Sequence, residues 1–234
     1  MVLARAGAEV VVCDINAEGG EATADAIAEL GRKSLFVQAD ISTPDAVTAM
    51  MDRVAALFGR LDIVVNNAAV EYFGSIEDTS IEEWDHTQAV NLKGIFLMTK
   101  AALPMLRKSK SGVVINIASV HAVATIPDLG AYAATKGGIV AITKSLAQDL
   151  GREGIRAICI SPGFVDSPMT QAWAESTPNV EETWARVFAM HPVGRVGTPE
   201  DIGNLIAFAC SDLGSYINGT NIVIDGGLLS KLHH

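Results

Sequence analysis

The chain has 234 residues, of which 49% are hydrophobic and 19% charged, so it can bury the core of one α/β domain. Its formal net charge of −10 disfavours nucleic acid and anionic membranes as partners, because both carry the same sign of charge. The three cysteines, Cys13, Cys159 and Cys210, are far apart in apolar surroundings, which predicts reduced thiols rather than disulfides or a metal cluster.

The first residues read as the end of a helix, because residues 1–6 lead through Gly7 straight into a strand pattern at 8–14. A dinucleotide-binding unit starts with a strand, a glycine-rich turn and a helix whose N-terminal amides hold the pyrophosphate. Strand and turn are not found before residue 8, so the sequence predicts an N-terminally truncated domain. Either the start codon lies inside a longer reading frame, which we expect, or the chain is natively short.

Short runs rich in valine and isoleucine alternate with longer segments of helical periodicity. This alternation predicts a Rossmann-like, doubly wound parallel sheet with its first strand missing and with helices on both faces. The expected strands are 8–14, 34–40, 62–67, 112–119, 155–163 and 221–227. The expected helices are 17–31, 43–59, 79–107 and 131–151, with another starting at 198. No linker or repeat is visible, so residues 1–234 are expected to form a single NAD(P)-binding domain.

No signal peptide or membrane span is recognisable, because the apolar run that starts at Val10 stops at Asp14. We therefore expect the protein in the cytoplasm. The histidines at the C-terminus, in residues 231–234, are given no metal-binding role.

Ser119, Tyr132 and Lys136 form the strongest chemical constellation. Tyr132 and Lys136 are four apart on an expected helix and share one face, while Ser119 closes a strand at the sheet edge where open α/β folds bind ligands. A tyrosine pKa of ~10 is too high for proton transfer at neutral pH, so a neighbouring ammonium and a positive nicotinamide ring are expected to lower it. The alternative is a packed tyrosine, a solvated lysine and a strand end.

This spacing resembles the signature of the short-chain dehydrogenase/reductase family, a Tyr-x-x-x-Lys pair preceded by a serine thirteen residues before the tyrosine. Further family landmarks follow in order over essentially the whole chain: Asn66-Asn67-Ala68-Ala69, Asn91, Pro162-Gly163, Gly194-Arg195 and Asp225-Gly226-Gly227. The resemblance implies hydride transfer between NAD(H) and a secondary alcohol or ketone. It gives each residue a role: acid/base for Tyr132, substrate-oxygen partner for Ser119, ribose ligand and pKa modulator for Lys136, and holder of a proton-relay water for Asn91.

The resemblance also implies where the cofactor binds. Asp14 would accept hydrogen bonds from the adenosine ribose and repel a 2′-phosphate, which favours NAD over NADP; alternatively, it caps a turn. Asp40 and Ile41 match a pair that contacts adenine, although Asp40 equally fits a turn. The other implied cofactor contacts are Asn67 and Ala68 at the ribose, Pro162, Gly163, Val165 and Ser167 over the nicotinamide, and Tyr132 and Lys136 themselves.

The substrate is less well defined by the sequence. Residues 169–190 match the place of a substrate lid, and His121 and Glu71 are candidates for contacting a substrate hydroxyl or carboxylate, or are ordinary surface residues. These polar groups favour a sugar or polyol. The helices at 79–107 and 131–151 resemble surfaces that build homodimers or homotetramers.

A second hypothesis is a non-catalytic protein, either a truncated fragment or a dinucleotide-sensing interaction module. It rests on the missing glycine-rich turn. The complete set of serine, tyrosine, lysine and asparagine favours the enzyme.

Overall fold

The computed structural model describes residues 1–230, so the histidines at 233 and 234 and the end of the expected domain lie outside the described residues. The strands are β1 (Val10–Asp14), β2 (Ser34–Gln38), β3 (Ile63–Asn66), β4 (Val113–Ile117), β5 (Arg156–Pro162) and β6 (Asn221–Ile224). The α-helices are α1 (Val2–Arg5), α2 (Ala17–Glu29), α3 (Pro44–Phe58), α4 (Ile81–Gln88), α5 (Gly94–Leu106), α6 (Gly130–Leu150), α7 (Pro168–Glu175), α8 (Val180–Met190) and α9 (Pro199–Cys210). A π-turn, η1 (Ala89–Lys93), joins α4 to α5, and the 3₁₀ helices are η2 (Val120–Ala122), η3 (Gly151–Glu153), η4 (Asp212–Gly214) and η5 (Leu228–Ser230).

The sheet is parallel throughout but is divided into two parts. β1 pairs with β2, with Val12 opposite Phe36, and the other strands follow in the order β3-β4-β5-β6. Within residues 1–230, neither β1 nor β3 has a second bonded neighbour. β1 and β3 are therefore edge strands within the described residues.

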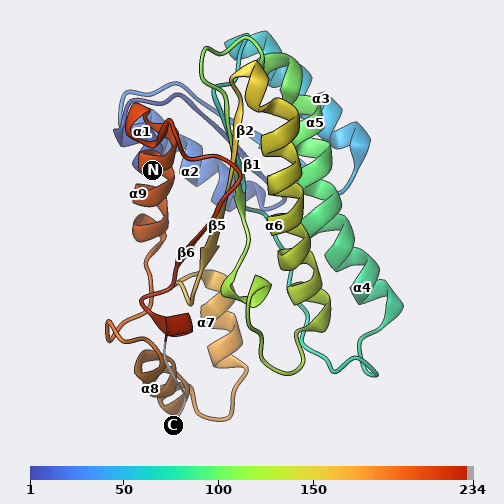
Figure 1. Cartoon of the computed structure of the whole chain (residues 1–234), viewed down its shortest axis with the longest axis vertical. Helices are drawn as coiled ribbons and strands as arrows, with labels where there is room; N and C mark the ends of the chain where they lie inside the picture. Colours follow the sequence, from blue (N-terminus) through green and yellow to red (C-terminus); the bar gives the residue numbers. More distant parts are fainter. Residues whose placement is uncertain (231–234) are drawn as a thin grey trace.

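Helices cover both faces, which confirms the predicted fold class. Figure 1 shows α1, α2 and α9 on one side of the strands and α3, α5 and α6 on the other. β2 illustrates how alternation produces this layering: the ring of Phe36 packs so closely on Gly20 of α2 that a side chain there would collide with it, while Val37 is buried in a cluster with Met50 of α3.

That cluster joins the two parts of the sheet. It combines Val37 with Val64 and Val114 of the larger part through side chains of α3 and α5. A second cluster packs β4, β5 and β6 against α9. Side-chain packing rather than strand pairing therefore holds β1 and β2 to the rest of the domain.

Capping side chains and glycines define several helix ends. Ser80 and Thr198 each form a capping box, with Glu83 and Asp201 respectively, and Gly59 ends α3 in the left-handed conformation at φ 75°. Gly151 is the C-cap of α6 but stays right-handed because η3 follows directly, and Gly154 makes the left-handed turn at φ 78°.

One continuous helical stretch in the described part of the chain, Ile81–Leu106, is long and apolar enough to cross a membrane by length and composition alone. It includes α5, which packs against α3 and β3 within the domain. We interpret it as a core helix, and the cytoplasmic location stays a prediction. Cys13, Cys159 and Cys210 are all unpaired thiols.

Candidate active site

A cleft of about 770 Å³ opens where the strands end at their carboxyl termini. Fourteen of the fifteen site residues predicted from the sequence line it, and Asn91 does not. The lining residues among them are Asp14, Asp40, Ile41, Asn67, Ala68, Glu71, Ser119, His121, Tyr132, Lys136, Pro162, Gly163, Val165 and Ser167. The fold thus brings together residues that are spread from Asp14 to Ser167 in the sequence.

Ser119 and Tyr132 meet at the base of the cleft. Ser119 follows β4 and its hydroxyl accepts a hydrogen bond from the backbone N–H of His121 at 3.2 Å. Tyr132 stands in the first turn of α6, is 8% exposed, and is hydrogen-bonded to Ser119. A hydroxyl pair at the end of a buried strand is suited to holding one substrate oxygen.

The pKa of Tyr132 is raised above its ordinary value, whereas the sequence predicted that a neighbouring ammonium and a positive nicotinamide ring would together lower it. Burial is the main cause, and the negative charge of Glu71 adds to it, while the bond to Ser119 acts in the opposite direction. Lys136 does not compensate: its Nζ lies 5.1 Å from the centre of the tyrosine ring and donates instead to the carbonyl of Ile117 at 3.0 Å.

Lys136 is itself a buried cation, with 2% exposure. Burial lowers its pKa to about 8, although nearby Cys159 and Glu71 favour the charged form. A lysine held in this way is pre-positioned to donate hydrogen bonds into the cleft.

Asn91 lies behind the wall of the cleft, in the π-turn η1, and is 1% exposed. Its Oδ1 accepts from the N–H of Val70 at 2.8 Å, and its Nδ2 donates to the carbonyl of Val70 at 2.9 Å and to Thr135 Oγ1 at 3.3 Å. The side chain therefore fixes the loop that carries Asn67 and Ala68. The sequence predicted one unbroken helix here and gave no signal for the π-turn.

Asp14 and Asp40 form one end of the cleft. Asp14 accepts a hydrogen bond from the N–H of Asn16 at 2.9 Å, and Asp40 accepts one from Ser42 at 2.8 Å, which holds the pKa of Asp40 below its ordinary value. Both carboxylates thus have the turn role that the sequence left open, and both also line the cleft.

Pro162 to Ser167 form the other end. A side chain on Gly163 would approach the Cα of Asp225 to 3.0 Å, so glycine allows the backbone of this segment to lie close to the loop after β6. The N–H of Gly197 donates to the carbonyl of Phe164 at 2.9 Å. Ser167 caps α7 by accepting from the N–H of Thr170 at 3.3 Å.

His121 and Glu71 both face the cleft. The ring of His121 meets that of Tyr132 edge-on at 6.0 Å between centres, and burial lowers its pKa. Glu71 is half-buried, and burial raises its pKa above the ordinary value while Lys136 acts in the opposite direction. Neither is an ordinary solvated surface residue.

A buried polar chain under the site was missed from the sequence. Asn66 Nδ2 donates to Asn116 Oδ1 at 2.8 Å, and Asn116 Nδ2 donates to Thr143 Oγ1 at 2.9 Å, which links β3, β4 and α6. The available signal was an asparagine in the middle of the apolar run of β4, a position where a polar group needs a buried partner.

No group of three or more histidine, cysteine or carboxylate side chains suited to a metal ion occurs among residues 1–230. The polar side chains that line the cleft include hydroxyl groups, carboxylates, the ammonium of Lys136 and the imidazoles of His86 and His121.

Comparison with known proteins gives matches over nearly the whole chain. The family model described as enoyl-(acyl carrier protein) reductase matches residues 1–229. A trans-4-hydroxycyclohexanecarboxylate dehydrogenase of Sinomonas cyclohexanicum is 38% identical over 232 residues, 97% of this chain and 85% of the relative.

Two solved structures are similar to this one. A candidate short-chain alcohol dehydrogenase from Sinorhizobium meliloti 1021 has a TM-score of 0.91 at 32% identity, covering 99% of this chain and 90% of its own. A gluconate 5-dehydrogenase from Burkholderia cenocepacia J2315, in complex with NADP and tartrate, has a TM-score of 0.90 at 28% identity, with 99% and 89% covered. With nearly all of this chain matched, the comparisons do not support the N-terminal truncation predicted from the sequence.

Proposed function

Because the chain belongs to the short-chain dehydrogenase/reductase family, we propose that it transfers a hydride between NAD(H) and a secondary alcohol or ketone. Membership makes it an NAD(P)-dependent oxidoreductase of alcohols and ketones. What we propose beyond this membership is the preference for NAD and the role of each residue. The observation that carries it is the meeting of Ser119, Tyr132 and Lys136 in one cleft.

In the direction of reduction, Ser119 donates a hydrogen bond to the substrate carbonyl and Tyr132 donates a proton to the same oxygen. The bound dinucleotide supplies the hydride to the carbonyl carbon. In the direction of oxidation, the phenolate of Tyr132 accepts the alcohol proton. Lys136 would bind the ribose of the dinucleotide.

Asn91 has a positioning role in this proposal. The side-chain amide of Asn91 is already hydrogen-bonded to the backbone of Val70. We therefore assign the backbone of Asn91, within the π-turn, to binding a water molecule that returns a proton to Tyr132. A π-turn supports this because it interrupts the regular helical bonding and because such turns are common at functional sites.

The residues present fit a dinucleotide at both ends of the cleft. Asp14 and Asp40 offer carboxylates where the adenosine ribose and adenine would bind, and the Pro162–Gly163 segment lies beside Tyr132 in the same cleft. The carboxylate of Asp14 repels a 2′-phosphate, which supports NAD over NADP. Asn67, Ala68, Ile41, Val165 and Ser167 complete the proposed contacts.

We also propose a cytoplasmic homodimer or homotetramer built through α5 and α6, a surface on which Phe96 is 49% exposed. The partners of such an assembly are small alcohols and ketones rather than nucleic acid or membrane.

Fluorescence titration with NADH and a coupled assay of NADH oxidation by a panel of ketones test the proposal. The wild type and Tyr72→Phe, a surface tyrosine bonded to His86, should bind NADH and oxidise it, while Tyr132→Phe should bind it without oxidising it. Binding without turnover by the wild type would favour a dinucleotide-sensing module. Failure to bind NADH would exclude the preference for NAD, and failure to bind both NADH and NADPH would exclude the enzyme.

A further inference from the structure

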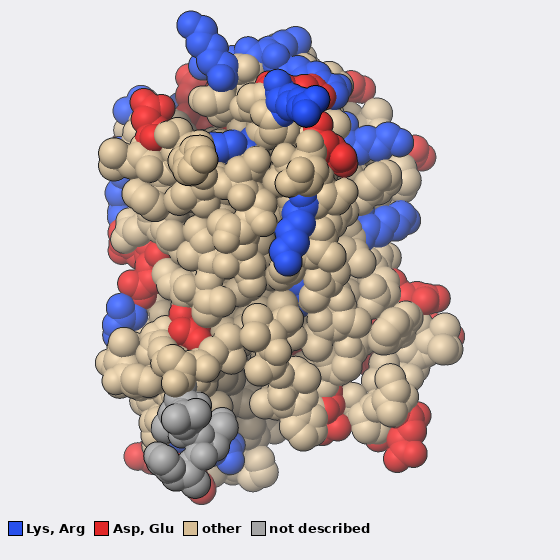
Figure 2. All heavy atoms as spheres, viewed as in Figure 1, with Lys and Arg blue, Asp and Glu red and all other residues tan. Residues whose placement is uncertain are grey.

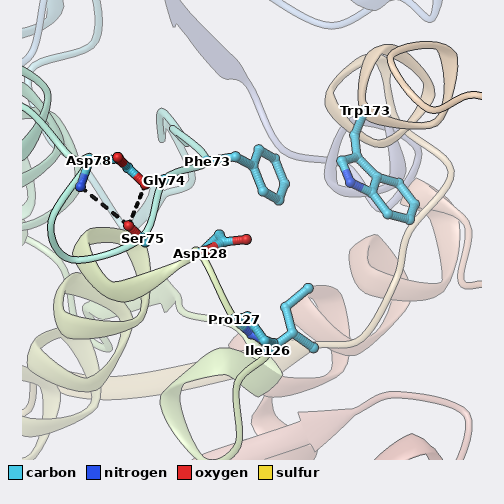
Figure 3. A pocket seen from close by; sticks show the side chains of 8 residues that line it. All are labelled: Phe73, Gly74, Ser75, Asp78, Ile126, Pro127, Asp128 and Trp173. Atoms are coloured by element: carbon cyan, nitrogen blue, oxygen red, sulfur yellow. Dashed lines mark hydrogen bonds between the residues drawn. The ribbon is translucent and has the colours of Figure 1, made fainter.

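A second cavity, of about 540 Å³, adjoins the cleft on the side away from Asp14 and Asp40. The two cavities share the side chains of Phe73, Ile126 and Trp173. Figure 3 shows Phe73 and Trp173 facing each other across this second space, with Ile126 and Asp128 along its edge. A substrate whose carbonyl rests on Tyr132 therefore has room to extend beyond the reacting carbon.

The shape of this distal cavity is fixed in advance. The N–H of Gly74 donates to the carbonyl of Asp128 at 2.9 Å, and a parallel bridge joins Gly74 to Leu129, so the two loops of the rim are tied together. Asp128 adopts the left-handed conformation at φ 66°, which an aspartate tolerates better than most residues. On the opposite side, Trp173 packs on Phe164 at 5.6 Å between ring centres.

The rim combines apolar side chains with polar ones, and the aromatic and aliphatic side chains among them are partly open to water. Phe73 is 50% exposed and Ile126 is 43% exposed, and both line the distal cavity. An apolar ligand would remove this area from water, which is the usual way a concave site gains affinity. Polyhydroxylated ligands would gain little from these side chains.

The charges around the two cavities are almost all negative. No arginine lines them in the described part of the chain, and the one lysine, Lys136, is buried at the base with its Nζ on the carbonyl of Ile117. Glu71 stands beside Tyr132 in the cleft, and Asp78 and Asp128 lie at the distal rim. Figure 2 shows most lysine and arginine side chains of that face in its upper half, around the ends where the strands begin. A negative group on a substrate would find no arginine to pair with.

We infer that the substrate is a secondary alcohol or ketone with an apolar ring or chain and no negative charge, and that Glu71 excludes acids. This inference rests on the proposed function, since it names the substrate class of the same site. It assigns Glu71 to selectivity among substrates, and it replaces the sugar or polyol with a more apolar compound. The two anions held with the gluconate 5-dehydrogenase, NADP and tartrate, are the type of ligand that this cleft would disfavour.

Binding of a matched acid and ester, together with a hexitol, tests the inferred substrate class without depending on turnover. The probes are 4-oxocyclohexanecarboxylate, its ethyl ester and a hexitol, and binding is followed by tryptophan emission, with Trp173→Phe identifying the signal from the cavity. We expect the ester to bind roughly ten-fold more tightly than the acid. Glu71→Gln should reduce this difference in affinity between ester and acid by strengthening the binding of the acid. Asp25→Asn, which removes an exposed carboxylate on α2, should leave the difference unchanged.

The inference is overturned if the acid or the hexitol binds as tightly as the ester, if the ester fails to bind, or if Glu71→Gln leaves the difference in affinity intact. NADH oxidation with the same ketones is measured in parallel. Preference for the ester without any oxidation would contradict the proposed function alone, whereas oxidation without that preference would contradict only the inference about substrate class.

Discussion

The side chain of Asn91 bonds to both backbone groups of Val70, receiving the N–H at 2.8 Å and donating to the carbonyl at 2.9 Å. The side-chain amide of Asn91 thus satisfies the backbone N–H and carbonyl of Val70 as a neighbouring strand would, although Asn91 lies in a π-turn. The loop that follows β3 owes its position to this pair, and that loop carries one wall of the cleft.

Replacing Asn91 by alanine should therefore destabilise the fold as well as the site. Two partly buried backbone groups would lose their partner, at ~1–3 kcal/mol each, so the free energy of unfolding should fall by roughly 2–6 kcal/mol in urea denaturation. The matched control is Asn179→Ala, which removes an exposed helix cap and should cost about 1 kcal/mol. Equal losses for the two variants would contradict the role given to Asn91.

Removal of the Tyr132 hydroxyl should abolish chemistry without loss of structure. Tyr132→Phe keeps the ring packed against His121 but has no proton to donate, so kcat should fall by ~10²–10⁴-fold while the dissociation constant of NADH stays within a factor of a few. Stopped-flow and equilibrium titration measure the two quantities. A variant that still turns over at wild-type rate would remove Tyr132 from the mechanism.

Lys136 should make stability rise with pH in the alkaline range. Its pKa is about 8 in the folded protein and near its ordinary 10.5 when unfolded, so between these values the unfolded chain binds more protons and the folded state gains stability as pH rises. The raised pKa values of the three thiols act in the opposite direction, so the test is a comparison of variants. Between pH 7.5 and pH 10, the change in the free energy of unfolding in urea should be more favourable in the wild type and in Lys144→Met, an exposed control, than in Lys136→Met.

Glu71 should set the pH at which alcohol oxidation begins. Because its negative charge helps to raise the pKa of Tyr132, Glu71→Gln should move the ascending limb of the kcat profile to lower pH. Asp128→Asn, at the distal rim, should leave the limb in place. A limb that does not move in Glu71→Gln would show that burial alone controls the tyrosine.

Asp14 should control the choice between NAD and NADP. Asp14→Asn removes the charge that repels a 2′-phosphate while keeping the acceptor for the N–H of Asn16, so the ratio of kcat/KM for NAD over NADP should fall roughly ten-fold or more. Asp25→Asn controls for a general loss of negative charge. An unchanged ratio would leave the preference unexplained by this residue.

Much of the fold was predictable because its signals are local. The strands are recognisable as short apolar runs. Ser80 and Thr198 begin helices with capping boxes, each of which is a pattern within four consecutive residues. Fourteen site residues line one cleft because parallel strands place their following loops at the same edge of the sheet.

The features that escaped prediction depend on contacts between distant residues. The π-turn around Asn91 follows from its bonds to Val70, twenty-one positions away. The raised pKa of Tyr132 comes from burial and from Glu71, neither of which a Tyr-x-x-x-Lys spacing reports. The distal cavity needs the loops of Gly74 and Asp128 to be tied together, which no local pattern contains.

Because the sheet is divided into two parts, a bound dinucleotide would also stabilise the fold. Asp14 and Asp40 belong to the small part, β1 with β2 and its following turn, whereas Ser119 and Tyr132 belong to the large part. Within residues 1–230 no strand pairing joins the two parts, which are held together by side-chain packing and by the chain that runs through α3. A molecule that contacts both ends of the cleft would bind to both parts of the sheet, so a protein with an occupied site should resist separation of the two parts. Cofactor concentration then becomes a determinant of how long the protein survives, in addition to how fast it works.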